Sequence, residues 1–435
     1  MSKSNNKFTN TISDLGGIKG TPIITFFVCF IGMTMSTADQ ALFSYAIPGL
    51  TSEFGISLEQ VALILTYSFF LASIALFATG TLSDFFGRKS MFVILLCMSA
   101  FCVGMHAITE TFTYLSIFRI LGFAIAAGLY PISLTIVIEA SPAKYRGLFG
   151  GLLQISYPVG FFTASLFAAP LIENFGWRSI FYPAFAVIPI ALFLGMHLKE
   201  TEVFKSVKKK KQVELSIESP RNRINLASVS KHYSLLFSKE FIRRTILCFS
   251  GTFFMALALG GITYFLPTFL VTDRGMSESL AAQVSGLSYL IGAPGYILAS
   301  SIGEFFTTRR NTLIIWIWLG ALAFGFTIWF AQGTLMLVLG FGATVMFLFG
   351  TEAVRMPLLG EIFPTHIRAT ASSIVGSLAV TVAWLTVPIL LTSLAPVLGW
   401  TMTWTVCAIL PVTLSGFMFL ALKNYPSGVE LEKIS

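Results

Sequence analysis

Charged residues are scarce in this chain. Asp, Glu, Lys and Arg make up 11% of its 435 residues, whereas 55% are hydrophobic. A soluble domain carries roughly 25% charged residues, so this chain cannot cover its surface for water. The composition therefore predicts a protein that is embedded in lipid.

Several chemical signatures are missing as well. The five cysteines lie inside apolar runs without CxxC spacing, so no disulfide framework or metal site is indicated. The four histidines stand in no metal-binding pattern, and no Gly-x-x-x-x-Gly-Lys-Ser/Thr loop is present to bind ATP. No nucleophile stands out beside a base. We therefore expect no cofactor, no metal and no enzymatic activity.

Long apolar runs are what the chain has in abundance. Runs of roughly 20 residues are long enough to cross hydrocarbon as helices, and they recur in two sets of six. The predicted spans are residues 22–48, 58–82, 90–108, 113–138, 148–170 and 178–198 in the first set, and 245–270, 279–302, 312–331, 334–359, 370–394 and 401–422 in the second.

A polar segment separates the two sets of spans. We predict an N-terminal six-helix lobe at 1–198, a cytoplasmic linker at 199–244 and a C-terminal six-helix lobe at 245–435. The linker contains the basic run Lys208–Lys211. This run is either a contact with anionic lipid or a solvated face that marks the cytoplasm.

The basic residues are distributed asymmetrically. If the N-terminus is inside, 24 of the 28 Lys and Arg residues fall on the inner side of the membrane. By the positive-inside rule this places both termini and the linker in the cytoplasm. The chain is then a multi-pass protein of a bacterial inner membrane. The basic residues form no stripe with interleaved aromatics, so we expect no nucleic-acid partner.

Two phrases recur in the same order about 220 residues apart. The phrase Gly80–Lys89 returns imperfectly as Gly303–Arg310, and the phrase Glu139–Arg146 returns as Glu361–Arg368. In the second pair Glu, Pro and Arg keep one register. Repeated phrases at a fixed spacing indicate that one half of the chain duplicates the other.

The first phrase carries a family resemblance. Residues 80–89 read Gly-x-Leu-x-Asp-x-x-Gly-Arg-Lys, which resembles the signature loop of the major facilitator superfamily; its second copy has Thr307 where the second Gly is expected. The resemblance implies an all-α membrane protein of 12 transmembrane helices in two pseudo-symmetric six-helix bundles. It also implies a secondary transporter that works as a monomer, with its site between the bundles.

Other phrases resemble one branch of that superfamily, the metabolite and aromatic-acid:proton symporters. They are Asp39–Pro48, Glu361–Thr370 and the acidic phrase Lys199–Phe204. The aromatic-acid members carry two acids in the first helix, whereas the earlier position here is Ser36.

The recurring phrases are expected to gate the cytoplasmic face. Glycines let two helices approach closely and turn sharply, and charges at helix ends form charge-assisted bonds only while that face is closed. We expect latches at Asp84/Arg88, Glu139/Arg146 and Glu361/Arg368; the alternative is a purely structural role. The gating candidates are Gly80, Asp84, Gly87, Arg88, Lys89, Glu139, Arg146, Glu304, Arg309, Glu361 and Arg368.

A few ionisable residues fall inside the predicted spans. Asp39 lies in span 1 and Arg119 in span 4, and charge at membrane depth indicates a functional site. A carboxylate beside an Arg that can move away is a workable proton carrier. In proton-coupled members of the superfamily an acid and an Arg at these places play this role. The alternative is a static ion pair between helices.

Span 10 supplies a second charged pair, Glu352 and Arg355, which are three residues apart on one helix face. They either satisfy each other, or Arg355 faces the cavity and holds a substrate carboxylate with its planar fork. The remaining substrate-binding candidates could equally be packing residues; they are Gln40, Gln154, Tyr157, Tyr264 and Trp384.

These features predict a proton-coupled symporter that imports a small organic solute, in first place a carboxylate metabolite, by alternating access. Its partners would be the solute, protons and the bilayer. A sugar or polyol symporter and a proton-coupled efflux antiporter are alternatives. Export is disfavoured because Tyr157 stands where a Gly-Pro-rich fifth helix would have Gly. A non-transporting sensor is the alternative of another class.

Overall fold

The computed structural model describes residues 20–142, 146–200, 235–364 and 367–424, and these residues form helices without a strand among them. Most of the predicted linker, including Lys208–Lys211, lies outside the described residues, as do the polar residues 1–19. Within the described residues ten helical segments are long and apolar enough to cross a membrane.

The described residues of the first half form nine helical elements. They are α2 (Thr21–Phe54), α3 (Leu58–Phe86), α4 (Arg88–Met105), α5 (Phe112–Ala127), α6 (Leu129–Ala140), α7 (Arg146–Leu153), α8 (Ser156–Phe175), the 3₁₀ helix η2 (Trp177–Phe181) and α9 (Ala184–His197).

The second half repeats this plan. Its elements are α12 (Ile242–Thr272), α13 (Glu278–Gly292), α14 (Pro294–Phe305), α15 (Arg309–Phe330), α16 (Thr334–Leu348), η3 (Phe349–Thr351), α17 (Glu352–Ile362), α18 (Arg368–Ala371), the π-helix η4 (Ser372–Leu378), α19 (Ala379–Trp404), the π-helix η5 (Thr405–Ile409) and α20 (Leu410–Leu420).

Each of the twelve predicted spans falls on one or more helical elements, whereas ten described segments are by themselves long and apolar enough to cross a membrane. Segment 372–420 holds two of the predicted spans, because the chain leaves helical geometry at Gly399, where φ is 74°. The span predicted at 279–302 is divided into α13 and α14, which have 15 and 12 residues. The fold prediction is therefore confirmed as an all-α bundle built from two related halves.

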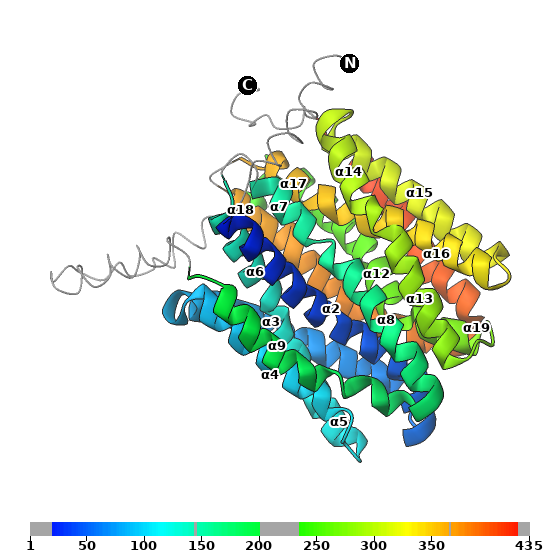
Figure 1. The fold of residues 1–435 in the computed structure, drawn as a ribbon. Helices are drawn as coiled ribbons and strands as arrows, with labels where there is room; N and C mark the ends of the chain where they lie inside the picture. The colour runs from blue at the N-terminus through cyan, green and yellow to red at the C-terminus, as the bar shows by residue number, and fades with distance from the viewer. Residues whose placement is uncertain (1–19, 143–145, 201–234, 365–366, 425–435) are drawn as a thin grey trace.

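Two ends of the bundle can be distinguished. We call the linker side the end where α2 begins and α9 and α20 end, and the far side the end that carries the α2–α3 turn (Figure 1). On the linker side, Gly87 joins α3 to α4 with φ 92°, a conformation that side chains with a Cβ rarely adopt. On the far side, Ser57 and Gln60 form a capping box that starts α3.

The outer surface of the bundle is apolar. Large side chains on several helices are more than half exposed, among them Leu322 at 70%, Phe330 at 67% and Phe326 at 54%. A water-soluble protein rarely exposes so much contiguous apolar surface. In hydrocarbon, by contrast, helices that satisfy their own backbone are the stable solution. This is an integral, multi-pass membrane protein.

The two bundles meet along three helix pairs: α8 with α13, α3 with α19, and α2 with α12. The first pair is in closest contact, since a Cβ atom on Gly286 would overlap the Ser165 side chain. Hydrogen bonds cross the seam from mid-depth toward the far side. Ser44 Oγ donates to the Tyr264 carbonyl at 2.9 Å, and Thr66 Oγ1 donates to the Leu385 carbonyl at 3.2 Å. The bundles are thus closed against each other on the far side.

We expect the Gly286→Val variant to keep the far side from closing, because its added side chain needs the space of Ser165. Overpacking a tight contact costs about 1–3 kcal/mol. A membrane-impermeant maleimide should then label a cysteine at Ser279 several-fold faster than in the parent. Gly325→Val is the control, because a Cβ at Gly325 meets its nearest neighbour at an ordinary 3.6 Å. Equal labelling of both variants would contradict the closure described above.

Candidate functional site

Two buried opposite charges lie in the N-terminal bundle. Asp39, in the middle of α2, is 7% exposed, and Arg119, on α5, is 3% exposed. They are close enough for their charges to act on each other. No hydrogen bond or ion pair joins them in the described part of the chain. Asp39 and Arg119 therefore interact through their charges at a distance and do not form an ion pair.

Aromatic rings surround Arg119. Its guanidinium carbon lies 4.1 Å from the ring centre of Phe43, 5.0 Å from that of Phe123 and 5.9 Å from that of Tyr264. Cation–π attraction stabilises a desolvated guanidinium in such a place. Among the described residues, however, the buried Nε and Nη2 atoms have no hydrogen-bond partner.

The fully buried ring of His106 belongs to this neighbourhood, and the charge of Arg119 acts on it. His106 stacks on Phe181, with 5.0 Å between ring centres, and its Nδ1 lies 2.9 Å from the Val103 carbonyl. Its Nε2 has no partner in the described residues. A single His at the end of an apolar run gives no pattern, so sequence reasoning assigned it no role.

The second predicted pair does close. Arg355 donates from Nε and Nη2 to the two carboxylate oxygens of Glu352, at 3.0 and 2.6 Å. The Arg355 side chain is 2% exposed and that of Glu352 is 23% exposed. Glu352 is therefore the member that remains accessible, and Arg355 is its buried counter-ion. Of the two alternatives for this pair, the structure has the one in which Glu352 and Arg355 hydrogen-bond to each other.

Polar side chains from both bundles gather near Glu352. Its charge acts on the hydroxyl group of Tyr130, and Gln154 Nε2 donates to that hydroxyl at 2.7 Å. The Tyr157 hydroxyl lies 3.0 Å from Thr263 Oγ1 of the other bundle. The structure thus brings Gln154, Tyr157 and Glu352 to one region of the seam.

Two further binding candidates, Tyr264 and Trp384, lie in an aromatic cluster across the seam, and Gln40 lies on α2. The Phe69 ring of α3 is 5.6 Å from the ring of Tyr264 and 5.1 Å from that of Trp384, between ring centres. The Tyr264 hydroxyl, Trp384 Nε1 and Gln40 Oε1 are buried without partners among the described residues. Buried polar atoms are normally hydrogen-bonded, so this cluster has unused binding capacity.

On the linker side the charges pair differently from the prediction. Arg88 lies 3.6 Å from Glu139, and Arg309 forms an ion pair with Glu361 and another with Glu304 at 2.5 Å. Arg146 and Arg368 instead donate from Nε to backbone carbonyls five residues earlier, those of Ser141 and Phe363. The pairs Glu139/Arg146 and Glu361/Arg368 are therefore corrected: Glu139 and Glu361 pair with Arg88 and Arg309, which begin other helices.

The start of α4 has a further partner. Glu200 accepts hydrogen bonds at Oε1 from the backbone N–H groups of Arg88 and Lys89, at 3.0 and 3.4 Å. A carboxylate at a helix N-terminus satisfies free N–H groups and complements the helix dipole. The acidic phrase after span 6 was the sequence signal for this contact. Gly80 and the Asp84 side chain lie outside what the structure describes.

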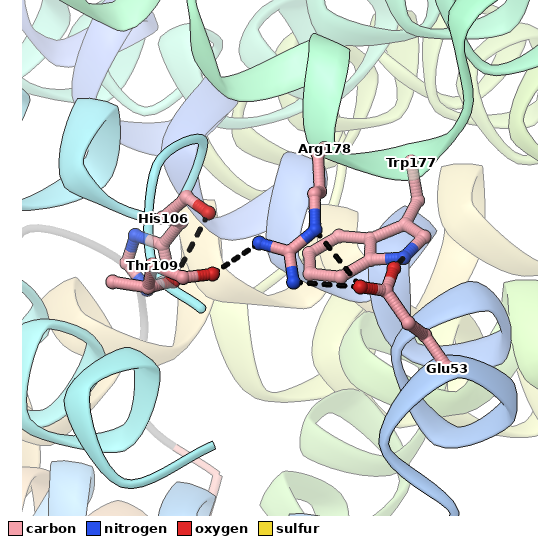
Figure 2. A network of polar contacts seen from close by, with 5 residues as sticks. All are labelled: Glu53, His106, Thr109, Trp177 and Arg178. Carbon is pink, nitrogen blue, oxygen red and sulfur yellow. Dashed lines mark hydrogen bonds and ion pairs between the residues drawn. The ribbon is translucent and has the colours of Figure 1, made fainter. Parts of the chain in front are cut away.

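The far side is held by a cluster that we call the clasp: Glu53, Trp177, Arg178 and Thr109 (Figure 2). Glu53 accepts a hydrogen bond from Trp177 Nε1 at 2.7 Å and two from Arg178, from Nε at 3.1 Å and Nη2 at 2.7 Å. Arg178 also donates to the Thr109 carbonyl. The clasp ties the end of α2 to the segments after α4 and α8.

A groove of about 490 Å³ opens beside the clasp, between α8 and α13. Two carboxylates line it from opposite bundles, Glu173 and Glu278, and Ser279 Oγ donates to Glu173 at 3.4 Å. Glu278 lies at the far-side rim, ahead of the apolar residues of α13. Partial burial raises the pKa of its carboxyl group.

Comparisons with known proteins agree with this architecture. A family model described as Major Facilitator Superfamily matches residues 29–353. The cis,cis-muconate transport protein of Acinetobacter baylyi is 27% identical over 417 residues, covering 92% of this chain and 95% of that protein. A putative niacin/nicotinamide transporter of Bacillus subtilis is 27% identical over 350 residues, covering 79% and 82%. The inward open xylose transporter of E. coli matches with a TM-score of 0.70 at 16% identity, covering 95% of this chain and 100% of that one.

Removal of the negative charge from the clasp should destabilise the protein. Glu53→Gln leaves Arg178 without a charged partner, and because the pair is partly exposed we expect a loss of about 1 kcal/mol. Thermal unfolding in lipid nanodiscs would measure it, with Glu110→Gln, an exposed acid of the same side, as the control. Equal melting of the two variants would show that the clasp does not stabilise the fold.

Closure of the far side should depend on pH through Glu278. Because burial raises the pKa of this carboxyl group, the closed seam is favoured while Glu278 is protonated and loses stability as pH rises through that raised pKa. Labelling of a cysteine at Ser279 should accelerate with pH in the parent and lose part of this dependence in Glu278→Gln. If the labelling rate of Glu278→Gln depended on pH as it does in the parent, Glu278 would not control closure of the far side.

Proposed function

Since this chain belongs to the Major Facilitator Superfamily, as the match over residues 29–353 shows, we propose that it is a proton-coupled symporter that imports a small organic carboxylate by alternating access. That it is a membrane transporter and not an enzyme follows from the family and from its relatives. What we propose beyond this is the coupling ion, the direction of transport and the substrate class.

The observation that carries the proposal is the arrangement of Asp39 and Arg119. Two buried opposite charges lie near each other without a closed ion pair. Asp39 is on α2, which packs on α12, and Arg119 lies 5.9 Å from the ring centre of Tyr264 on α12. A carboxylate whose countercharge can approach or recede suits reversible protonation. Arg119 and, next to it, His106 and Tyr264 are the ionisable groups around it. Asp39 takes a proton from outside and releases it inside.

The orientation follows from the placement of basic residues. With 24 of 28 Lys and Arg residues on the linker side, we assign that side to the cytoplasm. The far side then faces outward, and the structure corresponds to a state closed to the outside. The salt bridges Arg88–Glu139 and Arg309–Glu361 lie on the cytoplasmic side in this assignment, where rearranging them would accompany opening and closing.

The substrate class is inferred from the relatives and from the seam. The A. baylyi protein is named for muconate, a dicarboxylate, and the B. subtilis protein for niacin, whose anion is a monocarboxylate. The seam of this chain offers cationic and polar groups for such anions: Arg119, Gln154, Tyr157 and Tyr264. Glu352 and Arg355 neutralise each other beside them.

Proteoliposomes that contain the pure protein provide the test. Carboxylates, sugars, amino acids and lipophilic cations are added outside while external pH is followed. Alkalinisation with carboxylates alone would support the proposal. Alkalinisation with sugars would show that the substrate is a sugar and not a carboxylate. Acidification with lipophilic cations would show that the protein exports and does not import.

We expect Asp39→Asn to abolish proton-driven accumulation while counterflow, the exchange of labelled for unlabelled substrate, continues. The neutral amide cannot release a proton but leaves the binding groups in place. Asp273→Asn is the control, since Asp273 pairs with Arg274 at 3.5 Å in the far-side loop. Accumulation by Asp39→Asn that still follows the pH gradient would disprove the role of Asp39.

A further inference from the structure

Three arginines of this chain show how a guanidinium is used. The edge formed by Nε and Nη2 presents two parallel donors, which match the two oxygens of a carboxylate. In Arg355 this edge donates to both carboxylate oxygens of Glu352. In Arg178 the same two nitrogens both donate to Oε1 of Glu53. In Arg119 the same two atoms, Nε and Nη2, are buried and have no partner in the described residues.

The faces of the Arg119 guanidinium are already in use. Phe43 lies 4.1 Å away and Phe123 lies 5.0 Å away, measured from the guanidinium carbon to each ring centre. These rings supply no acceptor in the plane of the guanidinium. The in-plane edge remains free. Burying the hydrogen-bond donors of a charged group without acceptors costs free energy. The nearest carboxylate, Asp39, does not close onto it.

The second bundle adds a donor beside this edge. Tyr264 of α12 is fully buried, and its ring centre lies 5.9 Å from the Arg119 guanidinium carbon. Its hydroxyl lies close enough to the guanidinium to interact with it but forms no closed hydrogen bond in the described residues. The backbone carbonyl of Tyr264 accepts the hydrogen bond from Ser44 that closes the seam. A group held by Arg119 and Tyr264 together would therefore connect the two bundles.

We propose that Arg119 and Tyr264 form the anchor for the carboxylate group of the transported substrate. The inference rests on the proposed function and assigns the carboxylate to a different arginine from the one that sequence reasoning favoured. Arg355 is neutralised and lies behind Glu352, whereas Arg119 retains its charge and its two-donor edge.

The anchor explains how binding and protonation are linked. Arg119 can neutralise one carboxylate at a time, either the ionised Asp39 or that of the substrate. A substrate anion on the free edge therefore favours protonated Asp39, and the two enter together as an anion and a proton. His106 is the other titratable group that Arg119 influences. Because the seam closes over Tyr264, the anchor is reached when the bundles part.

The test measures equilibrium binding of cis,cis-muconate, benzoate, nicotinate and nicotinamide to the purified full chain in nanodiscs by calorimetry. Nicotinate and nicotinamide share a ring and differ in charge, so they isolate the carboxylate. We expect wild-type protein to bind at least one of the carboxylates and to bind nicotinamide at least tenfold more weakly than nicotinate.

The variants then locate the binding group. Tyr264→Phe removes one hydroxyl and should weaken carboxylate binding about tenfold, as loss of one hydrogen bond to a charged group does. Tyr289→Phe is the matched control, because Tyr289 is also a buried tyrosine of the seam whose hydroxyl lacks a partner in the described residues; its affinity should equal that of the parent. Arg119→Lys should weaken binding more than Tyr264→Phe, since Lys lacks the two-donor edge.

The outcomes separate this proposal from the one on which it rests. Unchanged affinity in Tyr264→Phe and Arg119→Lys, or wild-type protein that binds none of the carboxylates, would overturn the anchor. Carboxylate binding that depends on both residues, but without proton flux in proteoliposomes, would retain the anchor and remove the coupling. Asp39→Asn should still bind the carboxylate, with an affinity that no longer varies with pH through this group.

Discussion

The cost of burying charge among apolar helices governs the arrangement of this protein. A charge in such a place is tolerated when a partner of opposite sign or a set of hydrogen bonds compensates for lost water. Arg355 has Glu352, and Arg309 has Glu361 and Glu304. Arg119 is held differently, by aromatic faces and a carboxylate at a distance, and its unmatched donors make it the place where a ligand has most to offer.

On the linker side, charges are paired in the same way in both bundles. In each bundle an Arg that follows the turn between two helices reaches a Glu at the end of another helix, as Arg88 reaches Glu139 and Arg309 reaches Glu361. A second Arg in each bundle donates to a backbone carbonyl five residues earlier. The duplicated sequence thus gives duplicated contacts, which tie helix ends within each bundle.

The seam between the bundles is built for reversible contact. It relies on close packing at Gly286, a few hydrogen bonds from single hydroxyl groups and stacked aromatic rings such as those of Phe161 and Tyr289, 4.2 Å apart between ring centres. None of these is an ion pair between bundles. Contacts of this kind are individually weak, as the alternating access that we propose requires.

The sequence by itself determined the class of structure, because hydropathy, the repeated phrases and the placement of basic residues depend on local composition. It also singled out buried polar residues such as Asp39, Arg119, Tyr157 and Tyr264, but not Ser44 and Thr66, whose hydroxyl groups donate across the seam. Only the tertiary structure decided which charges are paired. The rotation of a helix sets whether Arg355 contacts Glu352 or faces a cavity. Loop geometry sets whether Glu139 pairs with Arg146 or with Arg88. The position of His106 beside Arg119 was decided there too, because contacts between helices leave no periodic signal in the chain.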